Sequence, residues 1–291
     1  MAGTPLIEAA ELEALLATDT EVVLLDVRWA LGDPQGHQHY LDGHIPGAVF
    51  VDLHHELAGV PSPASGRHPL PDPEEFQAAA RRWGINRAST VVVYDATRAL
   101  AAARAWWLLR HAGFENVLVL NGGLDAWTGS GHRLETGEVM ALPGHVQLGW
   151  DQLPVIDMWA AQDFPGALLD ARAAERYTGE TEPIDPRAGH IPGALSHPTT
   201  QNLADDGRFL PTEALITGFA TLGIHAEAET EGNEDTAGTA PTVASYCGSG
   251  VTAAHQILAL HTIGITAALY PGSWSQYSAD ATRPAATGET P

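Results

Sequence analysis

The sequence predicts an α/β protein made of two tandem copies of one domain, each with a mainly parallel sheet flanked by helices. The hexapeptide "GHIPGA" occurs at 43–48 and again at 189–194, and the blocks around it recur in the same order. The two copies lie about 146 residues apart, which is the length of a domain rather than of a solenoid repeat. In both halves short apolar runs alternate with longer amphipathic ones, an order typical of parallel sheets covered by helices.

Three short apolar runs of the first half predict buried strands. They are "EVVLLDV" at 21–27, "TVVVYDA" at 90–96 and "NVLVLNG" at 116–122, and they are rich in residues that favour strands. The segment "ALAAARAWWLLRHAG" at 99–113 is longer and predicts a helix that ends at Gly113. A strand, a helix and a second strand in this order predict a parallel pair.

The second half repeats this order of elements. "ALLDAR" at 167–172 corresponds to "VVLLDVR" at 22–28, and "TVASYC" at 242–247 corresponds to "TVVVYD" at 90–95. The run "AAHQILALHTIG" that follows predicts a helix ending at Gly264.

These blocks divide the chain into a first domain at 1–135, a linker at 136–150 and a second domain at 151–291. The linker is expected because polar, Gly-rich residues join the last block of the first half to the second half. A further segment, 225–241, is acidic, rich in Gly and Thr, and has no counterpart in the first half. It predicts a surface insertion.

The charge of the chain excludes some partners. The net charge is −22, from 36 acidic and 14 basic residues, and all the basic residues are arginine. Such a surface repels nucleic acid and anionic membranes, and it also repels small anionic substrates unless the site supplies its own positive charge. The placement of the arginines is therefore informative.

The composition also indicates the compartment. No run reaches the roughly 18 apolar residues of a membrane helix, and the N-terminal stretch lacks the basic segment of a secretory signal. The single cysteine cannot form an internal disulfide. A reducing, cytoplasmic location is expected.

The only cysteine, Cys247, stands at the carboxyl end of a predicted strand, where parallel α/β sheets carry their active sites. The equivalent residue of the first half is Asp95. A lone cysteine is often a small buried hydrophobe, but here a Gly-Ser-Gly loop and a helix N-terminus follow it. Both features stabilise a thiolate, which predicts a nucleophile. The loop ends in neither the Lys-Ser/Thr pair of a P-loop nor the arginine of a phosphatase loop.

The loop is also expected to hold a persulfide formed on Cys247, because successive backbone N–H groups can turn toward its outer sulfur. The hydroxyl groups of two loop residues can add further hydrogen bonds. The residues of this predicted cradle are Gly248, Ser249, Gly250, Val251 and Thr252.

Taken together, these motifs resemble a tandem rhodanese-domain sulfurtransferase. The resemblance covers nearly the whole chain and rests on the doubled "GHIPGA", on "YD" in place of "YC" in the first half, on "CGSGVTA" at 247–253 and on "YPGSWSQY" at 270–277. The loop sequence is closest to the 3-mercaptopyruvate sulfurtransferase branch, since the thiosulfate branch carries basic residues after the cysteine. Two rhodanese-like domains are therefore expected.

The resemblance implies an activity and a set of partners. Sulfane sulfur is expected to pass from 3-mercaptopyruvate, a small anionic donor, through a Cys247 persulfide to a thiol such as thioredoxin or to cyanide, with release of pyruvate. This is double-displacement covalent catalysis. No metal or organic cofactor is expected, and neither nucleic acid nor membrane is an expected partner.

The resemblance also implies roles for individual residues. Arg176 and Arg187 are expected to bind the substrate carboxylate, since a guanidinium group suits a carboxylate. Proton transfer is expected from Ser249 together with His44, with Asp33 as the acid behind the histidine.

Two other functions stay open on the sequence. The first keeps the fold but takes thiosulfate as the donor and cyanide as the acceptor. The second is a persulfide carrier or regulatory module with low turnover.

Overall fold

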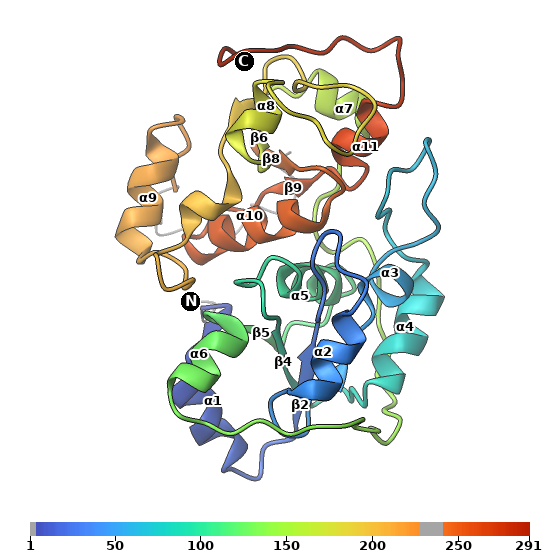
Figure 1. Ribbon diagram of the computed structural model, residues 1–291, viewed down its shortest axis with the longest axis vertical. Helices are drawn as coiled ribbons and strands as arrows, with labels where there is room; N and C mark the ends of the chain where they lie inside the picture. The colour runs from blue at the N-terminus through green and yellow to red at the C-terminus, as the bar shows by residue number, and fades with distance from the viewer. Residues whose placement is uncertain (1–3, 227–240) are drawn as a thin grey trace, which may run out of the picture. The chain divides into compact units, whose positions relative to one another are not determined.

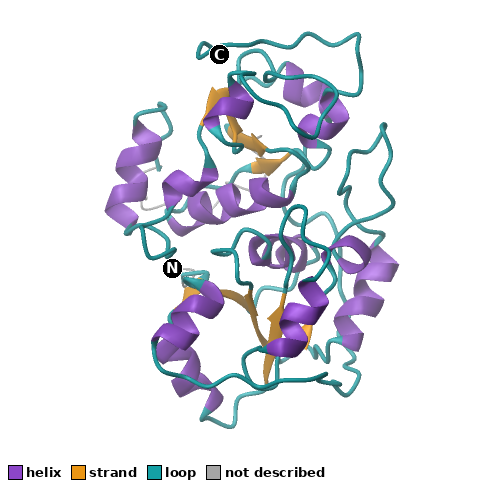
Figure 2. Ribbon diagram, in the orientation of Figure 1, coloured by secondary structure: helices purple, strands orange, loops and turns teal. Residues whose placement is uncertain are grey.

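The computed structural model describes residues 4–226 and 241–291, which form two compact units. The first unit comprises the described residues up to Val60 together with 70–153 and 205–208, and the second comprises the other described residues. In each unit strands lie among helices (Figure 2). The predicted α/β class with two parallel sheets is confirmed. Most of the expected 225–241 insertion, namely 227–240, lies outside the described residues.

In the part of the chain that the structure describes, the sheet of the first unit has five strands in the order β1-β5-β4-β2-β3, and every pair is parallel. Its strands are β1 (Leu6–Ile7), β2 (Val22–Asp26), β3 (Val49–Phe50), β4 (Thr90–Tyr94) and β5 (Val117–Leu120). Its helices are α1 (Ala9–Leu16), α2 (Gly36–Asp42), α3 (Leu53–Glu56), α4 (Pro73–Arg82), α5 (Ala102–His111) and α6 (Gly123–Gly129) (Figure 1).

Among the described residues the sheet of the second unit has four parallel strands, in the order β7-β6-β8-β9. They are β6 (Ala167–Asp170), β7 (Leu195–Ser196), β8 (Val243–Tyr246) and β9 (Ala268–Leu269). The helices are α7 (Met158–Gln162), α8 (Ala174–Tyr177), the 3₁₀ turn η1 (Thr199–Asn202), α9 (Thr212–Ala220), α10 (Val251–Thr262) and α11 (Ser273–Tyr277). The order matches β3-β2-β4-β5 of the first unit, as expected for a repeat.

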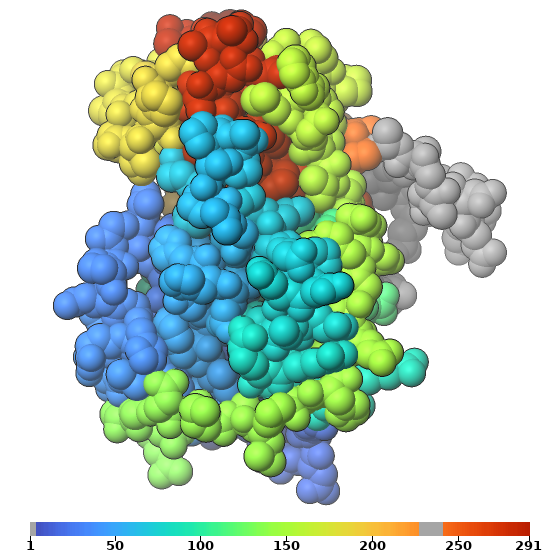
Figure 3. Space-filling model, turned by 90° about the vertical axis from the view of Figure 1, so that its right-hand side faces the viewer, coloured from blue at the N-terminus to red at the C-terminus, as the bar shows by residue number. Residues whose placement is uncertain are grey.

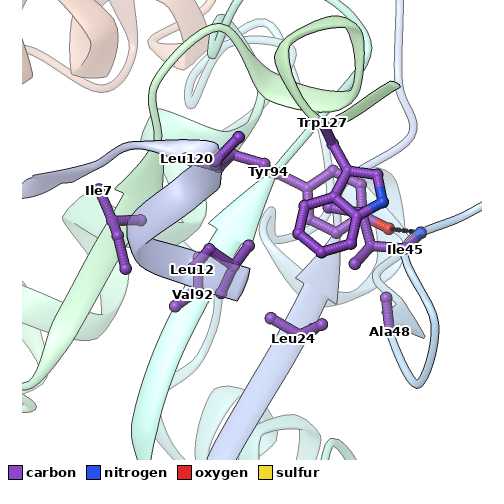
Figure 4. Close-up of a cluster of buried hydrophobic side chains, with 10 residues drawn as sticks. Ile7, Leu12, Leu24, Ile45, Ala48, Val92, Tyr94, Leu120 and Trp127 are labelled. Atoms are coloured by element: carbon purple, nitrogen blue, oxygen red, sulfur yellow. Dashed lines mark hydrogen bonds between the residues drawn. The ribbon is translucent and has the colours of Figure 1, made fainter. Parts of the chain in front are cut away.

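The strands are apolar along their length because helices cover the sheet. In the first unit α1 and α6 lie side by side (Figure 1), and Leu12 and Trp127 from these helices pack on Leu24 and Val92 of the sheet (Figure 4). Burying each such large side chain stabilises the fold by about 2–3 kcal/mol. The same core holds Tyr94, whose hydroxyl oxygen accepts a hydrogen bond from the backbone N–H of the "GHIPGA" segment (Figure 4).

The stretch 136–150, expected as a linker, belongs to the first unit. Its backbone bonds to the end of α4 and to the loop that follows it: the N–H of Gly144 donates to the carbonyl of Arg81 (2.7 Å) and that of Val146 to the carbonyl of Ile85 (3.1 Å). Figure 3 shows this stretch in lime green along the surface of the first unit. The boundary between the two units instead follows Leu153.

Candidate active site

Cys247 lies in the loop that joins β8 to α10, and it is buried, with 1 % of its surface exposed. The backbone N–H of Gly250, at the start of α10, points at its Sγ atom over 3.1 Å. Gly250 has φ 81, and a Cβ atom there would lie 2.5 Å from the carbonyl oxygen of Pro271, so this position requires glycine. An N–H donor and a helix N-terminus thus lie next to the sulfur, and both interact favourably with negative charge.

The C-terminal motif "YPGSWSQY" holds this loop in place. The carbonyl oxygen of Cys247 accepts a hydrogen bond from the N–H of Trp274, and that of Gly248 accepts one from Ser275, each over 2.9 Å. The N–H of Cys247 donates to the hydroxyl of Ser273 (3.1 Å). Both N–H and carbonyl groups of the loop are thus hydrogen-bonded to this motif, which keeps the sulfur in one position.

The other loop residues of the predicted cradle divide into two groups. Gly248 and Ser249 precede the helix, whereas Val251 and Thr252 form its first turn. Val251 is buried and Thr252 is partly exposed.

The equivalent loop of the first unit binds its own carboxylate. Asp95 accepts four backbone hydrogen bonds of 2.8–2.9 Å, from the N–H groups of Thr97, Ala99, Ala101 and Ala102. This strand–loop–helix geometry is therefore an anion cradle. Because the two halves are copies, the Asp95 loop illustrates how such a loop holds negative charge at the position that Cys247 occupies in the second unit.

Two arginines stand directly over Gly248. A Cβ atom built on this glycine would lie 3.0 Å from Nη2 of Arg67 and 3.3 Å from Nη1 of Arg176. Arg176, on α8, was expected near the site, but Arg67 was not. It belongs to the segment 61–69, which is part of the second unit.

The segment 61–69 is attached to the C-terminal residues. The N–H of Arg67 donates to the hydroxyl of Ser275 (3.1 Å), and the side-chain amide of Gln276 donates to the carbonyl of Ala64 (2.5 Å). Figure 3 shows the segment in sky blue against the red C-terminal residues. The same motif that fixes the Cys247 loop therefore also places Arg67.

Two buried carboxylates accompany these arginines. Nη2 of Arg176 donates to Glu182 (2.7 Å) and to Asp185 (3.0 Å), and Nη1 of Arg67 donates to the other oxygen of Asp185. The two acidic side chains are only 4 % and 3 % exposed. Burial raises the pKa of the Asp185 carboxyl above its ordinary value, although Arg67 opposes this shift.

Ser249 is hydrogen-bonded to a histidine that sequence reasoning did not name. Its Oγ lies 2.7 Å from Nδ1 of His68, and both residues are buried. A hydroxyl and an imidazole at this distance can pass a proton between them. The one sequence signal was an adjacent Arg and His in the Pro/Gly-rich loop 61–72, since loops carry functional residues.

The residues expected to complete the relay with Ser249 have other partners. His44 stacks on Tyr40 with ring centroids 4.2 Å apart, and its Nδ1 donates to the carbonyl of that residue (2.9 Å). Its counterpart in the other copy of the motif, His190, stacks on Tyr177 with ring centroids 3.7 Å apart. Its Nδ1 donates to the carbonyl of Tyr177 (2.8 Å). Both copies of the motif thus use the histidine to hold a tyrosine and its backbone.

Asp33 is also engaged elsewhere. Its carboxylate pairs with His39 (3.2 Å) and accepts the N–H of Gln35 (2.8 Å). Within the described part of the chain no hydrogen bond or ion pair joins Asp33 to His44, and Ser249 has His68 as its imidazole partner. The structure therefore does not pair Asp33 with His44 as expected, and the imidazole that it places on Ser249 is that of His68.

The guanidinium of Arg187 has different partners from that of Arg176. Its guanidinium donates to four backbone carbonyls of the C-terminal segment, those of Tyr277, Ser278, Asp280 and Arg283, over 2.7–3.0 Å. All three of its nitrogens are used, so the expected role as a carboxylate ligand is replaced by a structural one.

Arg187→Ala is expected to lower stability without changing substrate binding. Losing this cluster of charge-assisted bonds costs about 2–4 kcal/mol, which lowers the Tm by several degrees. The KM for a carboxylate donor should stay within twofold of wild type, whereas the matched change Arg176→Ala should raise it. A raised KM in Arg187→Ala at unchanged Tm would restore the original expectation.

None of the helices in the described part of the chain is long and apolar enough to cross a membrane.

Comparisons with known proteins agree with this architecture. The family described as "Rhodanese-like domain" matches residues 8–130. The chain is 46 % identical to a putative thiosulfate sulfurtransferase, SseB, of Mycobacterium tuberculosis, over 98 % of both chains. It is 44 % identical to a probable 3-mercaptopyruvate sulfurtransferase of Pseudomonas aeruginosa, over 99 % of this chain and 100 % of that protein.

A solved structure gives the same result. The crystal structure of SseA from Escherichia coli, described as a 3-mercaptopyruvate sulfotransferase with the rhodanese fold, matches with a TM-score of 0.78 and 35 % identity. The match covers 94 % of this chain and 99 % of that one. This chain, with its doubled parallel sheet and one cysteine-bearing loop, is therefore a sulfurtransferase of the rhodanese family.

Proposed function

We propose that this enzyme transfers sulfur from 3-mercaptopyruvate through a Cys247 persulfide to a thiol acceptor and releases pyruvate. The observation that carries this choice of donor is the 2.7 Å hydrogen bond between Ser249 and His68, two residues from the nucleophile. A mercaptopyruvate donor leaves as an enolate that needs a proton on carbon, whereas thiosulfate leaves as the stable anion sulfite. A proton relay beside the sulfur therefore serves the carbon-based leaving group.

The first half-reaction follows from the groups around the loop. The Cys247 thiolate, stabilised by the N–H of Gly250, attacks the thiol sulfur of the donor. A sulfur–sulfur bond forms, the carbon–sulfur bond breaks, and its electron pair stays on the pyruvate carbon. The proton of the donor thiol passes through Ser249 and His68 to that carbon, which leaves pyruvate and a Cys247 persulfide anion.

The arginines over Gly248 suit the donor carboxylate. Nη2 of Arg67 and Nη1 of Arg176 form no hydrogen bond in the described part of the chain. The other Nη atom of each guanidinium group donates to a buried carboxylate. Two such nitrogens can bind the two oxygens of one carboxylate. They would orient the donor with its sulfur toward the Cys247 loop.

In the second half-reaction an acceptor thiolate attacks the outer sulfur, which regenerates the Cys247 thiolate. A small protein thiol such as thioredoxin, or cyanide, fits this chemistry. We place the reaction in the reducing cytoplasm, where a lone free cysteine stays active. Neither half-reaction calls for a metal or an organic cofactor.

The test is a comparison of two donors. Pyruvate release from 3-mercaptopyruvate and sulfite release from thiosulfate are measured as kcat/KM, with cyanide and with a dithiol as acceptors. The expected result is a larger kcat/KM for 3-mercaptopyruvate. A larger value for thiosulfate would assign the protein to the other branch, and a persulfide seen by mass spectrometry that no acceptor discharges would make it a carrier.

A further inference from the structure

The carboxylate of Asp185 bridges the two arginines that stand over the Cys247 loop. One oxygen bonds to Nη1 of Arg67 and the other to Nη2 of Arg176 (3.0 Å). The acidic side chain is 3 % exposed, and its arginine partners are 29 % and 15 % exposed. Asp185 is therefore buried behind two guanidinium groups that reach solvent.

The bridge leaves one edge of each guanidinium for a ligand. Nη2 of Arg67 and Nη1 of Arg176, the nitrogens closest to the Cβ position of Gly248, take no part in it. The Nε atom of Arg67 is buried and has no hydrogen-bond partner among the described residues. The two Nη atoms face Gly248, the loop residue that follows Cys247.

The charges of this cluster cancel. Two positive guanidinium groups lie beside two buried carboxylates, those of Asp185 and Glu182. Glu182 also pairs with Arg172, whose own charge is balanced by Asp170. A ligand over Gly248 thus meets directed donors but little net positive charge.

Such a site treats a monoanion and a dianion differently. The donors can bind one carboxylate with good geometry, and one negative charge is tolerated close to Asp185. A second negative charge on the ligand is repelled by the buried acids about as strongly as it is attracted by the arginines, so it gains little from the cluster. 3-Mercaptopyruvate carries one negative charge at neutral pH and thiosulfate carries two.

We propose that Asp185 is a specificity-determining residue that makes the site favour monoanionic over dianionic sulfur donors. This inference rests on the proposed sulfur-transfer function and deepens it, because it assigns the choice of donor to a residue outside the Cys247 loop. A positioning role alone would affect both kinds of donor to the same extent.

The test is the ratio of kcat/KM for thiosulfate to kcat/KM for 3-mercaptopyruvate in wild type and Asp185→Asn. Asparagine keeps the size of the side chain and removes one negative charge. That charge acts twice as strongly on a dianion as on a monoanion, so the ratio should rise on the order of tenfold toward thiosulfate. A matched control is Asp206→Asn, since this exposed acid pairs with Arg208 and its loss changes the net charge equally. Its ratio should equal that of wild type.

A second pair of variants separates charge from shape. Asp185→Glu keeps the charge and should keep the wild-type ratio, whatever it does to the absolute rates. Glu182→Gln removes the neighbouring charge and should shift the ratio in the same direction as Asp185→Asn, so the proposal stays testable if that variant does not fold. A ratio that moves less than twofold in folded Asp185→Asn, or one that moves toward 3-mercaptopyruvate, would overturn the proposal.

Binding measurements make the proposal independent of turnover. In a Cys247→Ser background, which cannot form a persulfide, calorimetry measures the Kd of pyruvate as the monoanion and of thiosulfate as the dianion. Adding Asp185→Asn should tighten thiosulfate binding on the order of tenfold more than pyruvate binding. If this result holds while neither donor is turned over by the wild type, the proposed function fails and the charge selection stands. Equal changes for both anions would refute the charge selection alone.

Discussion

Cys247→Ser is expected to abolish sulfur transfer, with kcat lowered at least about 10⁴-fold. The chain has no second cysteine, so no other thiol can accept the sulfur. Serine is close in size to cysteine and can accept the same hydrogen bond from the N–H of Gly250. Its hydroxyl group does not ionise at neutral pH, so it cannot replace the thiolate as the nucleophile. Pyruvate release and the mass of the protein after incubation with the donor measure the effect, since wild type should gain one sulfur atom and the variant none.

The fold of this variant serves as the control. The first unit carries Asp95 at the equivalent position and closes its loop without sulfur, so the architecture does not require a thiol there. Cys247→Ser should therefore unfold within a few degrees of wild type. Pyruvate release above one hundredth of the wild-type rate, or a persulfide mass on the variant, would show that another group carries the sulfur.

His68→Gln is expected to lower kcat for 3-mercaptopyruvate by about 10²–10³-fold, the usual contribution of a general acid–base group. Glutamine can still hydrogen-bond to Ser249 but cannot take up and release a proton at neutral pH. The KM should change little, because the proposed ligands of the donor carboxylate are the arginines over Gly248 and not His68. Turnover of thiosulfate should fall much less, since its leaving group needs no proton on carbon.

The matched variant is His44→Gln, because this histidine is also buried and also bonds through Nδ1. Its imidazole contacts Tyr40, so its replacement should lower the Tm and leave kcat near wild type. Steady-state kinetics and thermal unfolding of both variants decide between the two relays. A larger loss of kcat in His44→Gln than in His68→Gln would favour the relay that the sequence resemblance implied.

Much of the fold could be read from neighbouring residues. Three strands of the first half, the helix after the Cys247 loop and the correspondence of Asp95 with Cys247 all follow from short apolar runs and repeated motifs in the sequence. The structure confirms the parallel sheets, and the two copies of "GHIPGA" make equivalent contacts, with Ile45 and Ile191 donating to Tyr94 and Tyr246. Repeats and periodicity reveal these features because they are encoded over a few adjacent positions.

The arginines show what the local sequence does not determine, namely the partners of each side chain. Arg176 and Arg187 are the same residue type in one segment and looked interchangeable as carboxylate ligands. Their partners differ: one pairs with Glu182 and Asp185 over the Cys247 loop, and the other fills its donors with backbone carbonyls of the C-terminal segment. Those acceptors lie about ninety residues away along the chain, and nothing in the local pattern identifies them.

The residues around Cys247 also fall into two groups, those that the local sequence identifies and those that only the tertiary structure brings to the loop. The prediction of Cys247 as the nucleophile and the glycine turn beside it both depend on the chain around residue 247, so the sequence alone was sufficient to make that prediction. Arg67 and His68 lie about 180 residues earlier, in a segment that has no part in the repeat. They reach the site because the segment 61–69 packs on the C-terminal motif. Long-range packing of this kind depends on the whole fold, so it is visible in the tertiary structure and not in the order of the residues.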